Sequence, residues 1–196
     1  MKLTILIGSM MLAASAGAFA QSTTAGSVQR DVNQQERIEQ GLKSGQLTTQ
    51  EAGKLEREES HVDKLQAQSL KDGKLTPAEK ARLEAAQNKA SRDIAAAKHN
   101  GVTGNPNSAS SQRMQADVQR NVNQEKRVEA GVQNGSLTNH EAAKLERGQA
   151  HVDRKEAAAA RDGHVGAAEE RGIQRSENRQ SRKIHRQKTD AQVRKG

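Results

Sequence analysis

The sequence predicts an all-α fold: two tandem three-helix repeats joined by a flexible linker, the second ending in a basic helix. Three observations support this prediction. The chain repeats itself at a constant offset, each copy carries the turn and cap residues that bound helices, and its apolar residues follow helical spacing.

The repeat is visible when the chain is aligned with itself. Residues 28–98 match 118–188 without gaps, and about 31 of the 71 aligned positions are identical. Between the copies, GVTGNPNSASS is rich in Gly, Asn and Ser, which predicts a flexible linker and independently moving copies. The predicted organisation is a signal peptide (1–20), a disordered lead (21–27), repeat 1 (28–100), the linker (101–114), repeat 2 (115–190) and a tail (191–196).

A second period of 28 residues inside each copy sets the helix ends. GLKSGQLTTQEAGKLE aligns with SLKDGKLTPAEKARLE, so that a Gly follows one helix and a Thr-x-x-Glu capping box opens the next. Helices are therefore predicted near 28–43, 49–71 and 77–98. In the second copy Gly166 replaces the capping Thr76, and Gly172 enters the last helix. We therefore expect 157–196 to be helical but poorly packed.

The apolar content of one copy is small. Leu83, Ala86, Ala90 and Ile94 follow the spacing of one helical face, but that face is narrow and half alanine. Burying a large aliphatic side chain contributes about 1.5–3 kcal/mol, whereas ordering a residue costs about 1.5 kcal/mol. A single copy is therefore marginal, and the sequence predicts that it needs the other copy, a homodimer partner or a ligand.

The first 20 residues have the features of an export signal. Lys2 precedes an uncharged, mostly apolar run, and Ala18-Phe19-Ala20 fits the small-x-small cleavage rule. The run is short for a transmembrane span, and no later segment is apolar enough for one. We therefore expect cleavage near Ala20, no transmembrane span in the mature chain, and a periplasmic or secreted location.

The composition excludes several function classes. The chain has no Cys, Trp or Tyr and one Phe, which excludes a disulfide scaffold and a thiol nucleophile and disfavours an aromatic-lined pocket or a base-stacking surface. No two of its six histidines have the i, i+4 spacing of a helical metal site. We expect no enzyme activity and no resident cofactor.

The turns between the helices resemble the second half of an EF-hand loop. In Gln68–Glu79, Asp72, Gly73 and Glu79 match the loop's fifth, sixth and twelfth positions, and related segments occur at 40–51, 130–141 and 158–169. The resemblance implies paired helix–loop–helix units and calcium binding, with Asp72 and Glu79 as the first ligand pair and Asp162 and Glu169 as the second. The loops depart from the family by lacking oxygen ligands at position 3, where Leu70 and Ala160 stand. Helix capping explains the same Thr and Glu residues without an ion.

The net charge is concentrated at the C-terminus. Residues 171–196 carry nine basic and two acidic side chains. Five arginines spaced 4, 4, 3 and 4 residues apart form a stripe on one helical face, opposite Ile173 and Ile184: Arg171, Arg175, Arg179, Arg182 and Arg186.

Two functions follow as hypotheses. Guanidinium groups suit phosphate and carboxylate oxygens, so the Arg stripe predicts a non-enzymatic exported binding or structural protein that contacts anionic envelope polymers, lipopolysaccharide or nucleic acid. Two other interpretations of the stripe remain open: a solvated basic tail that aids solubility, and a surface that binds a specific acidic protein. The alternative function is weak calcium binding by the EF-hand-like loops.

Overall fold

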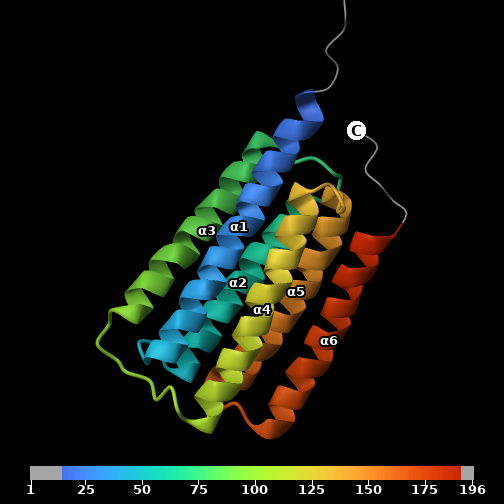
Figure 1. Cartoon of the computed structure of the whole chain (residues 1–196). Coiled ribbons are helices and arrows are strands. Elements are labelled where there is room, and N and C mark those ends of the chain that lie inside the picture. The colour runs from blue at the N-terminus through green and yellow to red at the C-terminus, as the bar shows by residue number, and fades with distance from the viewer. Residues whose placement is uncertain (1–14, 191–196) are drawn as a thin grey trace, which may run out of the picture.

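The computed structural model describes residues 15–190, with side chains from residue 24 onward (Figure 1). This part of the chain is helical and contains no strand, which confirms the all-α prediction. Its elements are α1 (Ser15–Ser44), α2 (Thr49–Ser69), α3 (Pro77–Lys98), α4 (Ala109–Gln133), α5 (Asn139–Ala159), the 3-10 helix η1 (Ala160–Asp162) and α6 (Ala167–Thr189).

The helices begin where the sequence places its capping residues. Thr48, Thr76 and Thr138 each accept a backbone N–H from the Glu three residues later, whose side chain accepts the Thr backbone N–H in return. At α6 only half of this arrangement remains. Gly166 has no side chain, and Glu169 Oε2 accepts its backbone N–H at 2.8 Å.

The two three-helix units pack against each other in an antiparallel arrangement. Helix α2 lies along α5 and α1 lies along α4, while α3 and α6 form the outer flanks (Figure 1). Residues 90 positions apart meet at the centre: Glu36 Oε1 lies 2.6 Å from Lys126 Nζ, and Ser60 Oγ donates to Ala150 O at 2.8 Å. Contacts between equivalent residues are typical of a twofold axis, so the units are related as the subunits of a symmetric dimer are.

Two apolar clusters close the ends of the bundle, and each takes residues from both units. One contains Ile38, Leu42, Leu47, Leu55, Ile94, Met114, Val118, Val152, Val165 and Ile173. The other contains Val28, Leu70, Val128, Val132, Leu137, Leu145 and Ile184. The small apolar surface of each unit is therefore buried against that of the other unit.

The N-terminal part of the chain differs from the sequence-based expectation in one respect. Residues 21–27, predicted to be a disordered lead, lie in α1, where Thr24, Ala25 and Ser27 are buried. Residues 1–14, most of the predicted signal peptide, and the predicted tail at 191–196 lie outside the described residues.

The connection between the units and the last helix also differ from expectation. Helix α4 begins at Ala109, and Gly104 N donates to Gly45 O at 2.8 Å, so the predicted linker is anchored on the preceding turn. Because α1 and α2 pack on α4 and α5, the units do not move independently. Helix α6 is well packed despite Gly172, since Ile173 and Ile184 are buried against the preceding helices.

Among residues 15–190, no helix is both long enough and apolar enough to cross a membrane.

The contact between α2 and η1, directly after α5, gives a stability prediction. A Cβ at Gly53 would lie 2.5 Å from the Ala160 Cβ, so Gly53→Val forces α2 away from η1. Overpacking of this kind lowers the free energy of unfolding by about 1–3 kcal/mol, which denaturant unfolding measures. Gly26→Ala is the control: a Cβ there meets nothing within 4 Å, and this variant should be more stable by about 0.5–1 kcal/mol. Equal effects of the two substitutions would contradict the close helix contact.

Candidate functional site

The five arginines of the predicted stripe lie on the exposed face of α6. Arg171, Arg175, Arg179, Arg182 and Arg186 are all exposed, while Ile173 and Ile184 on the opposite face are buried. Within the described part of the chain, the arginines that form ion pairs are Arg113 and Arg120, neither of them in the stripe. Arg179 donates one hydrogen bond to Ser176 Oγ at 2.9 Å, and no carboxylate among the described residues pairs with the stripe, so its guanidinium groups can meet an anionic ligand.

The stripe borders a groove between α5 and α6 that the sequence analysis missed. Two adjoining hollows, of about 720 and 290 Å³, share Lys144 and Lys183. We call this surface the basic groove and define it by Lys144 and Arg147 from α5 and Arg179, Lys183 and Arg186 from α6. Asp190, at the end of α6, is the one acidic residue lining the two hollows.

The corresponding surface of the first unit has its charge neutralised. There Lys89 Nζ lies 3.0 Å from Glu58 Oε1 and 2.5 Å from Asp93 Oδ2. Hydrogen bonds to these two carboxylates, Asp93 first, raise the pKa of Lys89. Ninety residues later the two acids are replaced by Gly148 and Lys183. The second unit therefore keeps the cations and loses their partners.

The electrostatic consequence is visible at His151, which lines the groove. Partial burial, and then the charges of Lys155, Arg154, Arg179 and Lys183, lower the pKa of this imidazole. Burial is the larger cause, and the four cations add to it because each disfavours a further positive charge nearby.

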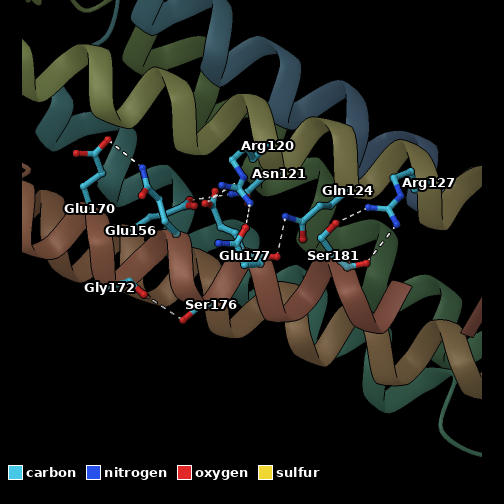
Figure 2. Close-up of polar contacts among 12 residues, drawn as sticks. Arg120, Asn121, Gln124, Arg127, Glu156, Glu170, Gly172, Ser176, Glu177 and Ser181 are labelled. Atoms are coloured by element: carbon cyan, nitrogen blue, oxygen red, sulfur yellow. Dashed lines mark hydrogen bonds and ion pairs between the residues drawn. The ribbon is translucent and has the colours of Figure 1, made fainter. Parts of the chain in front are cut away.

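Buried polar contacts hold α6 in place beside this surface. Gln180 Nε2 donates to Leu145 O at 2.8 Å, and a Cβ at Gly148 would meet the Gln180 side chain. On the other side of α6, Arg127 bonds Ser181 and Arg120 pairs with Glu177 at 3.2 Å (Figure 2). The cations of the groove thus stand on two helices fixed to a common core.

The residues of the EF-hand-like loops lie at the turns, where they bond the backbone. Asp72 Oδ1 accepts the Lys74 N–H at 3.0 Å, and Glu79 Oε2 accepts the Thr76 N–H at 3.0 Å. In the second unit Asp162 accepts the His164 N–H and Glu169 accepts the Gly166 N–H. These bonds are those of turns and helix caps.

The interior of the bundle holds many carboxyl groups. From residue 24 to residue 190, twelve acidic residues are buried and no Lys, Arg or His is. They are Asp31, Glu39, Glu56, Glu59, Asp63, Asp117, Glu125, Glu141, Glu146, Asp153, Glu156 and Glu177.

Burial is the main influence on the ionisation of these acids. It raises the pKa of Asp31 and Asp153 to about 7, against the hydrogen bonds that each accepts. It also raises the pKa of Asp117 to about 8 and of Glu177 to about 7; neighbouring carboxylates add to this, and Arg120 opposes it. An interior of this kind must take up protons or cations near neutral pH.

Both features have a sequence signal that could have been read. The basic groove appears when the copies are compared position by position, since Glu58 and Asp93 change to Gly148 and Lys183. The interior acids of α2 lie three and four residues apart, so they share one helical face: Glu56, Glu59 and Asp63. Charged residues are ordinarily assigned to the surface, which hides this pattern.

Comparisons with known proteins give no relatives: no family model matches the chain, and neither does any curated protein or solved structure. The fold and the site thus define the class only as an all-α protein with a basic interhelical groove.

Proposed function

We propose that this protein is an exported, non-enzymatic binding protein that holds a phosphate-bearing polymer in the basic groove. One observation carries the proposal: the second unit replaces both acids that neutralise the equivalent surface of the first unit. The predicted signal peptide at 1–20 supports the export of the chain.

The shape of the groove fits an extended polymer. Beyond the two α5 cations that define the groove, the exposed Arg154 extends the row, so that Lys144 to Arg154 spans a rise of about 15 Å along the helix. The arginines of α6 run antiparallel to them, as the bond from Gln180 to Leu145 and that from Lys155 to Gly172 O show. Two antiparallel rows of cations suit a linear chain of anionic groups rather than a single small anion.

The chemistry of the groove predicts binding without base recognition. The side chains lining it include no Phe, Tyr or Trp, and His151 is the one aromatic ring among them. Binding therefore depends on counterion release, and affinity should fall steeply with salt. Inorganic polyphosphate and single-stranded DNA of equal charge should bind alike.

The test is a charge substitution taken from the first unit. Lys183→Asp restores the acid found at Asp93, which pairs with Lys89 four residues earlier. The new Asp should pair in the same way with Arg179. Labelled polyphosphate is titrated with residues 21–196 at several salt concentrations. The variant should bind at least about tenfold more weakly at low salt, and its salt slope should be shallower by about two phosphate contacts.

A matched control separates the groove from net charge. Lys80→Asp changes the net charge equally but lies on α3, in the first unit. It should keep most of the affinity. The proposal fails if Lys80→Asp weakens binding as much as Lys183→Asp, or if the binding does not depend on salt.

A further inference from the structure

Three of the buried carboxylates converge in the middle of the bundle. Glu56 of α2 and Asp153 and Glu156 of α5 each place an oxygen within 4.8 Å of the others, and we call this group cluster II. All three side chains are fully buried. Oxygens that bind one calcium ion at 2.3–2.6 Å lie about 3 to 5 Å apart, so this spacing fits a shared cation.

Amide side chains orient the carboxylates of cluster II. Gln35 Nε2 donates to Glu56 Oε2 at 3.0 Å, and Gln149 Nε2 donates to Asp153 Oδ1 at 3.2 Å. Asn121 Nδ2 donates to Glu156 Oε2 at 2.8 Å (Figure 2). In each carboxylate one oxygen is therefore held by a side-chain N–H group. Carboxylates that bind metals are commonly held by neighbouring hydrogen-bond donors in this way.

The second oxygen of each carboxylate is left without a partner. Glu56 Oε1, Asp153 Oδ2 and Glu156 Oε1 are buried and accept no hydrogen bond, and neither does Asn121 Oδ1. Buried polar atoms are ordinarily paired, and an unpaired carboxylate oxygen is among the most costly to bury. Cluster II therefore has three oriented oxygens to which no amide, hydroxyl or basic side chain donates.

A second group follows from the pseudo-twofold relation. Asp31, Asp63 and Glu146 also place oxygens within 4.8 Å of one another, and we call them cluster I. Glu146 and Asp63 lie 90 residues from Glu56 and Asp153 of cluster II. Asp31 Oδ2, Asp63 Oδ2 and both Glu146 carboxylate oxygens accept no hydrogen bond.

The surroundings decide which cations fit. Both clusters offer only oxygen ligands, which suit hard ions such as Ca²⁺ and Mn²⁺. Zn²⁺ and Cu⁺ prefer nitrogen and sulfur ligands, so the clusters disfavour them. On α1 and α2 the clusters lie between residues of the two apolar clusters, Val28 and Ile38 on one helix and Leu55 and Leu70 on the other. The apolar ends exclude water and strengthen the attraction for a cation.

We propose that cluster I and cluster II each bind one hard divalent cation inside the bundle. Such ions satisfy the unpartnered oxygens and neutralise an interior that contains no basic residue from position 24 to 190. This site is distinct from the EF-hand-like loops, whose carboxylates bond the backbone. It is also independent of the basic groove.

The test counts ions bound to the chain. Residues 21–196 are stripped with EDTA, loaded separately with Ca²⁺ and Mn²⁺ at pH 7.5, and examined by native mass spectrometry and isothermal titration calorimetry. We expect two ions per chain. Glu56→Gln and Glu146→Gln should each leave one, and the double variant none. Glutamine keeps the shape of the side chain and removes a repelling charge, so these variants should fold, which circular dichroism checks.

Two controls make the result decisive. Glu79→Gln keeps a capping residue and should retain both ions; loss of an ion here would place the binding in the loops and overturn the proposal. Retention of two ions by the double variant would overturn it as well. So would a chain that binds no ion at millimolar concentration and whose infrared spectrum shows the interior carboxyls protonated. Polyphosphate binding should be unchanged in Glu56→Gln, which separates this test from that of the groove.

Discussion

Raising the pH from 5 to 7 in the absence of divalent cations is expected to remove at least about 4 kcal/mol from the free energy of unfolding, the contribution of two buried acids alone. Burial raises the pKa of Asp31 and Asp153 from 3.8 to about 7. In this window the folded chain keeps protons on these two groups, whereas the unfolded chain has released them. Stability is therefore highest at acidic pH and falls as the pH rises toward 7, the reverse of the usual behaviour of salt-bridged carboxylates.

The size of this effect is large against the 5–15 kcal/mol that stabilises an ordinary domain. Urea unfolding at pH 5, 6 and 7 in EDTA measures it. Asp31→Asn introduces the residue already present at the equivalent position, Asn121, and should remove about 2 kcal/mol of the pH dependence. Asp72→Asn, on an exposed turn, is the control and should leave the pH dependence unchanged. A free energy of unfolding that is flat or rises between pH 5 and 7 would show that the interior acids are ionised in the folded chain.

The second large effect is expected when the chain is divided in the linker. Residues 21–103 and 104–196 should each be largely unfolded alone, because the faces of α1, α2, α4 and α5 would lose their partners. Mixed at equal concentration, they should regain helicity and elute as a 1:1 complex. Circular dichroism and size-exclusion chromatography follow both changes.

The pseudo-twofold axis also predicts which pairs form. A dimer of the first fragment would place Glu36 against a second Glu36, whereas the intact chain pairs it with Lys126. The mixed complex should therefore be favoured over either homodimer. Gly53→Val in the first fragment should weaken the complex strongly, because that residue touches Ala160. Fragments that fold separately with the thermal stability of the whole chain would contradict the shared core.

Local features of the fold could be predicted from the sequence, and long-range ones could not. The capping boxes at Thr48, Thr76 and Thr138 depend on neighbours three residues away, so the starts of α2, α3 and α5 follow from the sequence. The exposure of the Arg stripe follows from its spacing opposite two isoleucines. These interactions lie within one helix or one turn.

The pairing of the two units was hidden by the chemistry of the surface they share. A contact between helices is ordinarily predicted from a stripe of apolar residues. The buried faces of α2 and α5 instead carry Glu56, Asp63 and Asp153. The α5 side of the basic groove was missed for a related reason. Lys144 and Arg147 have counterparts in the first unit, and only their loss of acidic neighbours distinguishes them.

The division of charge between the two units also sets the valency of the molecule. A symmetric dimer of identical chains would carry two basic grooves, on the opposite flanks occupied here by α3 and α6 (Figure 1). Such a dimer could bridge two polymer strands and cross-link them into a network. In the single chain, Glu58 and Asp93 neutralise the positive charge at one of these two places. Under the proposed function, we therefore expect one chain to offer one groove and to coat an anionic strand along its length without cross-linking strands.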